Sequence, residues 1–149
     1  MVSPLHRQVA NMRKSLFDQG FLDEQFVQLE ELQDDINPNF VEEVVSSFYK
    51  DSIRTMVNLE AALEQRPLDF SKLDSYMHTF KGSCSSIGAR RLKSECSHFR
   101  DFCRELNSEG CFKTYQLVKK EHDTLRKKLE TYFQVSRQAG PMETASRPK

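Results

Sequence analysis

The segment DFSKLDSYMHTFKGSCSSIG, residues 69–88, contains the clearest periodic pattern in this chain. Its apolar residues recur at steps of four, three, four and three: Leu73, Met77, Phe80, Cys84 and Ile87. This spacing is typical of an α-helix with one buried face, because successive residues advance about 100° around a helix axis. Asp69 is a suitable N-cap and Gly88 a suitable terminator, so the pattern predicts a helix between them.

The next two blocks of the chain repeat this spacing and predict two more helices of the same kind. One carries on its apolar face Leu92, Cys96, Phe99, Cys103 and Leu106, and a turn is expected at residues 107–110. The other carries Cys111, Tyr115, Val118, His122, Leu125, Leu129 and Tyr132. Three consecutive helices with one apolar rhythm pack side by side at shallow crossing angles, which is the geometry of an antiparallel four-helix bundle.

Three further helices are predicted before residue 69. The first spans about residues 4–18 and is stopped by Gly20. The second follows Asp23, a suitable N-cap, and its apolar face is expected to hold Phe26, Leu29 and Leu32. The third is longer, starts at Asn37–Pro38 and ends by Pro67, because proline cannot continue a helix. We therefore expect an all-α fold in which this long helix completes the bundle and the first two are N-terminal additions.

Length and charge limit the classes of function. The 149 residues fit one domain, which we expect to span residues 1–137, and residues 138–149 lose all periodicity and predict a disordered tail. The 22 Lys and Arg residues balance 22 Asp and Glu residues. A chain without net charge lacks the overall attraction on which nucleic-acid and anionic-membrane binding usually depends. We therefore expect neither nucleic acid nor a membrane as a partner.

Apolar runs and cysteines bear on cellular location. No run approaches the roughly 18–20 apolar residues of a membrane span, and residues 1–16 lack the apolar stretch of a signal peptide. The sequence has no CxxC pair, which argues against a zinc ribbon or a thioredoxin-type motif; its four cysteines are Cys84, Cys96, Cys103 and Cys111. We expect reduced thiols and a protein of the cytosol and nucleus.

The outer face of the helix predicted at residues 69–88 carries a histidine. Because each residue advances about 100°, His78 lies about 140° away from the centre of the apolar face and should face water. Lys81, Gly82 and Ser85 follow three, four and seven residues later on the same side. These residues are expected to form one surface patch.

Each residue type in this patch suits the same chemistry. A neutral histidine nitrogen is nucleophilic near physiological pH, and a lysine ammonium can hold an anion such as a phosphoryl group beside it. A glycine inside a helix costs about 1 kcal/mol relative to alanine, so Gly82 is expected to leave room for another macromolecule to approach the ring. The patch predicts phosphoryl acceptance at His78, supported by Lys81 and Gly82. Ser85 is either a further supporting residue or only a neighbour.

The segment HTFKGSCSSIGA, residues 78–89, resembles the signature of plant histidine-containing phosphotransfer proteins, the phosphorelay shuttles of two-component signalling. The resemblance extends from the first helix to about Phe133 and implies a four-helix bundle with capping N-terminal helices. It also implies that His78 is the phosphoacceptor, that Lys81 steadies the phosphoryl group and that Gly82 provides clearance. Pseudo-type members of that family lack the histidine, which is present here.

The same resemblance implies a phosphoryl carrier without catalytic activity of its own. The phosphoryl group would pass between His78 and the Mg²⁺-bound aspartate of receiver domains, with hybrid histidine kinases upstream and response regulators downstream, in cytokinin-type signalling. We expect a monomer. We also expect no cofactor or metal, because the sequence offers no acidic metal cage and no Gly-rich phosphate loop. Catalysis of the transfer would then rest with the partner.

Two alternatives accompany this interpretation. An autophosphorylating histidine kinase is disfavoured, because the chain leaves no room for a separate ATP-binding domain. A helical scaffold that binds partners without chemistry is the second alternative. A phosphorylation assay separates both from a carrier.

Several other residues have a simpler interpretation. His122 falls on an apolar face and is expected in the core, whereas His6 and His98 are expected on the surface. Glu95 and His98 match the ExxH spacing of di-iron bundles, but the sequence has no second copy, and we expect no metal site. The basic run at residues 90–93 is either a solvated helix start or part of a surface that meets an acidic receiver site.

Overall fold

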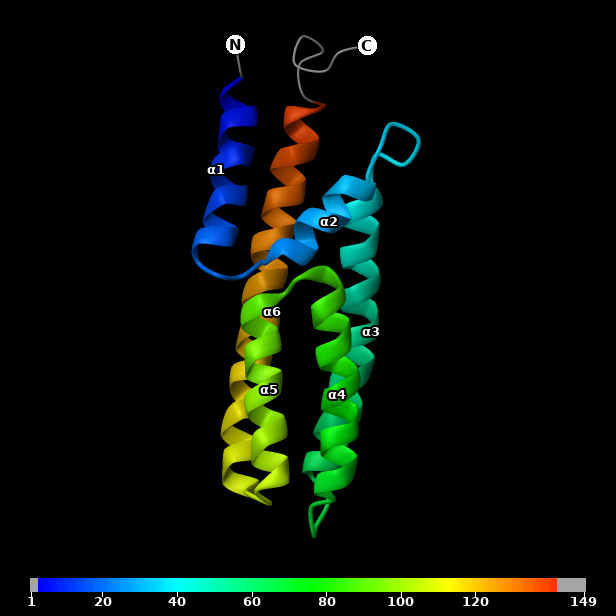
Figure 1. Cartoon of the computed structure of the whole chain (residues 1–149), viewed down its shortest axis with the longest axis vertical. Coiled ribbons are helices and arrows are strands. Elements are labelled where there is room, and N and C mark those ends of the chain that lie inside the picture. Colours follow the sequence, from blue (N-terminus) through cyan, green and yellow to red (C-terminus); the bar gives the residue numbers. More distant parts are fainter. Residues whose placement is uncertain (1–2, 142–149) are drawn as a thin grey trace.

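Six α-helices make up the described part of the chain in this computed structural model, which describes residues 3–141 (Figure 1). In chain order they are α1 (Pro4–Asp18), α2 (Glu24–Leu32), α3 (Phe40–Leu63), α4 (Phe70–Ile87), α5 (Arg90–Arg104) and α6 (Ser108–Ala139). No strand occurs within residues 3–141, where a single isolated bridge joins Leu22 to Ala89. The all-α prediction is confirmed.

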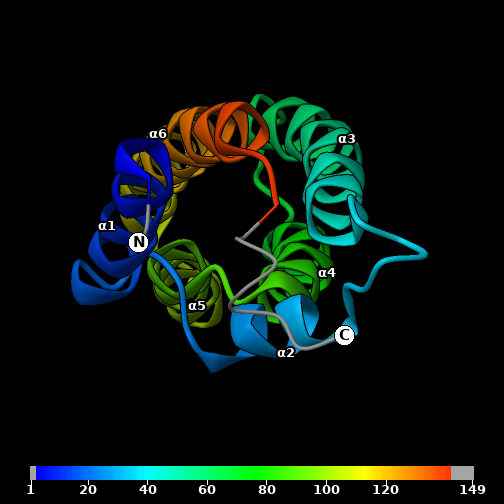
Figure 2. The ribbon, with the colours of Figure 1, turned by 90° about the horizontal axis from the view of Figure 1, so that it is seen from above.

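Helices α3 to α6 form an antiparallel bundle, which appears as a ring when it is viewed along its axis (Figure 2). Each of these helices contacts the next, and α6 closes the ring against α3. Helix α1 packs against α6, and α2 lies against α3 and α4 at one end of the bundle (Figure 1). The predicted four-helix bundle with two additional N-terminal helices is confirmed.

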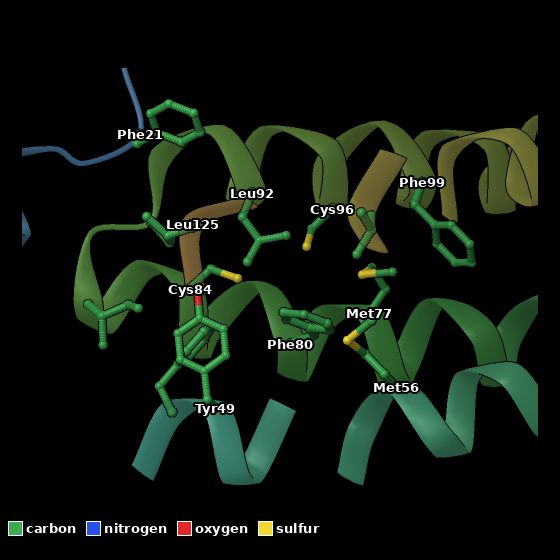
Figure 3. Packing of buried hydrophobic residues seen from close by; sticks show 14 of the residues in the cluster. Phe21, Tyr49, Met56, Met77, Phe80, Cys84, Leu92, Cys96, Phe99 and Leu125 are labelled. Atoms are coloured by element: carbon green, nitrogen blue, oxygen red, sulfur yellow. The ribbon is translucent and has the colours of Figure 1, made fainter. Parts of the chain in front are cut away.

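The predicted apolar faces meet in the centre of the bundle (Figure 3). No residue of the α4 series is more than 1% exposed: Leu73, Met77, Phe80, Cys84 and Ile87. Burying a side chain of leucine or phenylalanine size contributes about 1.5–3 kcal/mol. The four-three spacing therefore identified the residues that hold α4 in place, and the remaining face of α4 is free to carry a site.

Two residues that were predicted on apolar faces are exposed. Leu106 is 69% exposed and adopts a φ of 55°, so it lies beyond α5 and ends that helix. Leu32 is the last residue of α2 and is 64% exposed. The predicted turn at residues 107–110 is also wrong, because the Asn107 side chain accepts a hydrogen bond from the Gly110 amide and caps α6, which begins at Ser108.

Helix α3 begins later than predicted. It begins at Phe40 and not at Asn37–Pro38, because the Asp34 carboxylate accepts hydrogen bonds from the amides of Ile36 and Asn37 and holds that segment in a turn. It ends at Leu63, before Pro67. Helix α6 runs to Ala139, two residues past the predicted domain boundary, and most of the predicted tail lies outside the described residues. None of the helices between residues 3 and 141 has the length and apolar character needed to span a membrane.

Candidate functional site

His78 lies on the outer face of α4, with its side chain exposed to solvent. Its orientation follows from its two neighbours in the apolar series, Met77 and Phe80, which are buried and fix the rotation of the helix. The Asp69 side chain caps the start of α4 by accepting a hydrogen bond from the Lys72 amide. No side chain within residues 3–141 hydrogen-bonds the His78 ring.

Gly82 lies one turn after His78 and is exposed. A Cβ atom added at Gly82 would meet nothing within 4 Å, so packing among the described residues does not require a glycine there. Two other glycines differ: a Cβ at Gly110 would lie 2.3 Å from the Phe102 ring, and Gly88 has a φ of +73°. Gly82 thus weakens α4 without any gain in internal packing, and its effect is to leave the surface beside His78 bare.

Lys81 is half-buried on α4, and its side chain forms no ion pair with the described residues. Three residues separate it from His78, a spacing that places two helical residues on neighbouring turns of one face. An ammonium group without a carboxylate partner keeps its donors available for an incoming anion. The structure therefore keeps the predicted arrangement of His78, Lys81 and Gly82.

Ser85 is placed differently from the other three predicted residues. It lies about 10 Å further along the helix axis than His78, and its hydroxyl donates to the Lys81 carbonyl at 3.2 Å. It lines a groove of about 590 Å³ below α2, beside Asp23, Arg90 and Lys93. The structure therefore places Ser85 with this groove, which we call the α2 groove, and not beside the imidazole.

The α2 groove exists because backbone hydrogen bonds fasten the segment before α2 to the turn between α4 and α5. The Asp23 amide donates to the Gly88 carbonyl and the Arg90 amide donates to the Phe21 carbonyl, both at 3.0 Å. Of the basic run at 90–93, Arg91 is already engaged, since it donates to Glu121 at 2.8 Å and lies 4.2 Å from the centre of the Phe21 ring. Arg90 is exposed and remains at the edge of the groove.

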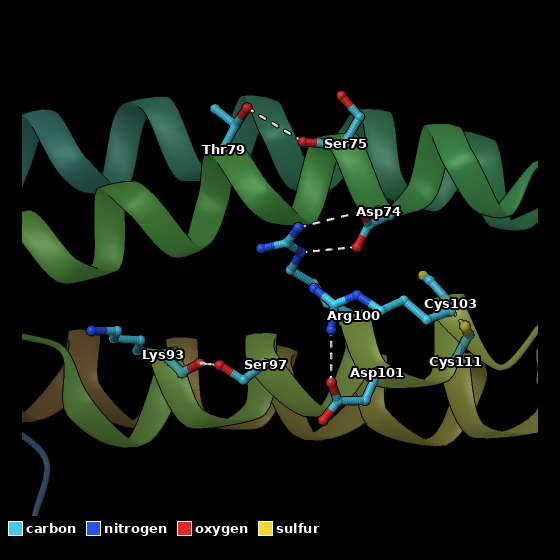
Figure 4. A network of polar contacts seen from close by, with 10 residues as sticks. Asp74, Ser75, Thr79, Lys93, Ser97, Arg100, Asp101, Cys103 and Cys111 are labelled. Atoms are coloured by element: carbon cyan, nitrogen blue, oxygen red, sulfur yellow. Dashed lines mark hydrogen bonds and ion pairs between the residues drawn. The ribbon is translucent and has the colours of Figure 1, made fainter.

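Sequence reasoning did not find the ion pair between Asp74 and Arg100, which Figure 4 shows joining α4 to α5. Asp74 lies one turn before His78, and its carboxylate accepts hydrogen bonds from Arg100 of α5, with a distance of 2.9 Å to Nε. The hydrogen bond from Arg100 lowers the pKa of Asp74, against the opposing effect of burial. The i, i+4 spacing of Asp74 and His78 was a local signal, but nothing in the sequence identified a partner 26 residues away.

The other histidines have structural roles. His122 is buried as predicted, with its Nε2 atom 2.8 Å from the Ser52 hydroxyl, and burial lowers its pKa to about 4. His98 is exposed as predicted and contacts Glu95, and no group of three metal-ligating side chains occurs among the described residues. His6 is half-buried and not simply at the surface, because its Nε2 atom donates to the Gly140 carbonyl at 3.0 Å.

Comparison with known proteins places this bundle in a family. The family model described as the Hpt domain matches residues 43–128, which include α4 and the exposed histidine. The chain belongs to the histidine-containing phosphotransfer (HPt) family. The resemblance inferred from residues 78–89 is thereby confirmed, and the HPt fold accounts for the arrangement of α3 to α6.

Similar HPt proteins come from several plants. Histidine-containing phosphotransfer protein 4 of Arabidopsis thaliana is 63% identical over 118 residues, which cover 79% of this chain and 93% of that protein. Pseudo histidine-containing phosphotransfer protein 5 of Oryza sativa subsp. japonica is 61% identical over 144 residues, covering 97% and 95%. The crystal structure of an HPt protein from Medicago truncatula superposes with a TM-score of 0.87 at 40% identity, covering 98% and 97%. Both HPt and pseudo-HPt names therefore occur among these relatives.

Proposed function

We propose that this HPt protein accepts a phosphoryl group on His78 from one receiver domain and delivers it to another in a two-component phosphorelay. The observation that carries the proposal is the exposed His78 ring beside the bare surface at Gly82. A phosphoryl donor must approach a ring nitrogen in line with the bond that breaks, which requires open space on one side of the ring. The family membership supports the same function.

The transfer step requires little from this chain beyond position and charge. The lone pair of a neutral ring nitrogen attacks the phosphorus of an aspartyl phosphate on the receiver, the N–P bond forms, and the P–O bond breaks to release the aspartate carboxylate. The Lys81 ammonium, which forms no ion pair with the described residues, offsets the charge of the phosphoryl group on His78. The return step reverses the same bonds. We propose a carrier, with catalysis supplied by the receiver.

The family resemblance extends this proposal to partners and location. Hybrid histidine kinases act as donors and response regulators as acceptors, in cytokinin-type signalling in the cytosol and nucleus. The protein acts as a monomer, with residues 1–137 as one HPt domain. Arg90 and Lys93 at the edge of the α2 groove provide positive charge for docking of an acidic receiver site.

The deciding experiment is phosphoryl transfer from a purified, phosphorylated receiver domain. We expect acid-labile label on this chain, and loss of that label in His78→Gln while the helical circular-dichroism spectrum is retained. Label that persists in His78→Gln would place the acceptor elsewhere. ATP alone should leave the chain unlabelled, because a carrier takes its phosphoryl group from a receiver domain.

Partner binding without chemistry is the second candidate function. It is favoured by three rice relatives with pseudo-HPt names, which are 61%, 60% and 56% identical to this chain. The same assay separates the two functions, since a scaffold would bind the phosphorylated receiver domain and remain unlabelled. We favour the carrier because His78 is present and exposed.

A further inference from the structure

Two pairs of cysteines face each other across helix interfaces in the core. Cys84 of α4 contacts Cys96 of α5, and their sulfur atoms point toward one another in Figure 3. Cys103 of α5 faces Cys111 of α6, with 3.8 Å between the two Sγ atoms (Figure 4). All four thiols are free and buried. The two pairs differ in how the chain around them is held.

The Cys103–Cys111 pair lies at the end of the bundle where α5 connects to α6. Cys103 is one residue from the end of α5 and Cys111 is the fourth residue of α6, so only a short connection separates them. Residues 105–107 of this connection are all exposed, and Leu106 has a positive φ. Helix ends and exposed turns open at low cost in free energy. Such opening admits a small oxidant and lets the sulfur atoms approach the roughly 2.05 Å of a disulfide.

The Cys84–Cys96 pair lies where the bundle is closed. The turn after α4 is buried at Gly88 and Ala89, and it is fastened to the segment before α2 by backbone hydrogen bonds. Burial also raises the pKa of the Cys84 thiol, which disfavours the reactive thiolate. This pair therefore serves as an internal comparison, because it offers the same functional groups beside a turn that is buried and fastened in place.

Cys111 is the more acidic thiol of its pair. It lies in the first turn of α6, where the backbone amide groups and the helix dipole favour a negative charge. The hydrogen bond from the Cys103 thiol further lowers the pKa of Cys111 and raises the pKa of Cys103. Cys111 is accordingly the sulfur that attacks an oxidant first, and Cys103 lies within reach to react with the product.

We propose that Cys103 and Cys111 form an oxidation site at which hydrogen peroxide produces an intrachain disulfide between α5 and α6. The Cys111 thiolate attacks one peroxide oxygen, the O–O bond breaks, and the departing hydroxide takes up a proton to leave as water. The Cys103 sulfur then attacks the sulfenic acid on Cys111, the S–S bond forms, and the hydroxyl group leaves with the Cys103 proton as a second water. Two thiols are oxidised and one peroxide is reduced to two waters.

Peptide mapping of the full chain tests this proposal, because trypsin separates all four cysteines. Cleavage after Lys and Arg places Cys84 in peptide 82–90, Cys96 in 94–100, Cys103 in 101–104 and Cys111 in 105–113. The reduced protein is freed of reductant, treated with hydrogen peroxide, blocked with iodoacetamide and digested without reduction. We expect peptide 101–104 linked to peptide 105–113 with the loss of two hydrogen atoms, and release of both by dithiothreitol.

Variants locate the reacting sulfurs. The link should persist in the Cys84→Ala/Cys96→Ala double variant and be lost in Cys103→Ala, in which dimedone should label Cys111 as a sulfenic acid. The proposal is overturned if peptides 101–104 and 105–113 are both recovered alkylated after peroxide treatment, or if 82–90 is linked to 94–100 in their place. The map of the unaltered chain decides this even where a variant fails to fold. The outcome is independent of phosphoryl transfer at His78.

Discussion

Arg100 of α5 donates hydrogen bonds from Nε and Nη2 to the carboxylate of Asp74 on α4, one helical turn before His78 (Figure 4). The two side chains are 17% and 30% exposed, so this ion pair is better protected from solvent than most in the chain. It joins the helix that carries the histidine to its neighbour in the bundle. The position of His78 therefore depends on a polar bridge as well as on the apolar face of α4.

Loss of this bridge should reduce stability more than loss of a solvated pair. In a double-mutant cycle, Asp74→Asn and Arg100→Gln are expected to show a coupling energy of about 1 kcal/mol in urea unfolding. The control pair, Asp101 and Arg104, has both side chains 58% exposed and should show coupling close to zero. Equal coupling in the two cycles would contradict the structural role given to Arg100.

Enlarging residue 82 should separate function from stability. Gly82→Ala should raise stability by about 1 kcal/mol, because alanine is the better helix former and a Cβ meets nothing within 4 Å. Gly82→Gln should fold equally well but transfer phosphoryl groups at least about tenfold more slowly. The glutamine side chain crowds the approach of a receiver domain to His78, and a cost of about 1.4 kcal/mol in the transition state slows transfer tenfold. Unfolding curves and transfer rates measured on the same samples test both statements. A Gly82→Gln protein with the wild-type rate would refute the clearance argument.

The opposite result is expected at Gly110. A Cβ there would lie 2.3 Å from the Phe102 ring, so Gly110→Ala forces the ring or the helix start to move. Overpacking of this kind costs about 1–3 kcal/mol. We expect a lower urea midpoint for Gly110→Ala and partial recovery in the Gly110→Ala/Phe102→Leu double variant. An unchanged midpoint would show that α6 can begin without the glycine.

The charge of Lys81 should affect the rate of transfer and not the fold. Lys81→Gln is expected to slow transfer by about tenfold to a hundredfold, because a hydrogen bond from a charged donor contributes about 1.5–3 kcal/mol. Lys120→Gln, on the exposed surface of α6, is the matched control and should transfer at the wild-type rate. The comparison is made by quenched-flow transfer from a phosphorylated receiver domain. Similar rates for the two variants would remove Lys81 from the mechanism.

His122 should make stability depend on pH. Burial lowers its pKa to about 4, from 6.5, so the folded state disfavours the protonated ring. The contribution of the neutral His122 ring to the free energy of unfolding is fully present above pH 6.5 and is lost as pH falls toward 4. At about 1.4 kcal/mol per pKa unit, the loss amounts to roughly 3 kcal/mol. Unfolding free energies measured across this range should fall less steeply in His122→Gln, which does not titrate. Parallel curves for the two proteins would disprove the assignment.

The elements that were predictable from the sequence are those set by local spacing. The apolar faces that contain Leu73 and Leu92 follow from the helical repeat alone. The exposure of His78 follows from its angle to the apolar face of α4. The end of α5 was mispredicted because it depends on the positive φ of Leu106, which an apolar residue does not signal. Local spacing thus located the helices better than their ends.

Contacts between residues that are distant in the sequence could not be predicted from local spacing. Arg100 could not be matched to Asp74, since this pairing depends on how α4 and α5 are aligned along the bundle. That Ser85 also lines the α2 groove could not be predicted for the same reason, because this groove requires the packing of α2 over α4. The sequence therefore predicted where His78, Lys81 and Gly82 lie on α4. It did not predict the neighbouring ion pair or the α2 groove.

The hydrogen bond from His6 to the Gly140 carbonyl brings the beginning and the end of the described chain together. A covalent linker between these two ends would need to span little distance, which makes the molecule suited to circular permutation. New termini in the exposed loop before Phe40 would give a chain that starts with the four bundle helices and finishes with α1 and α2. In such a chain the two capping helices become a terminal appendage that can be shortened stepwise without interrupting the bundle.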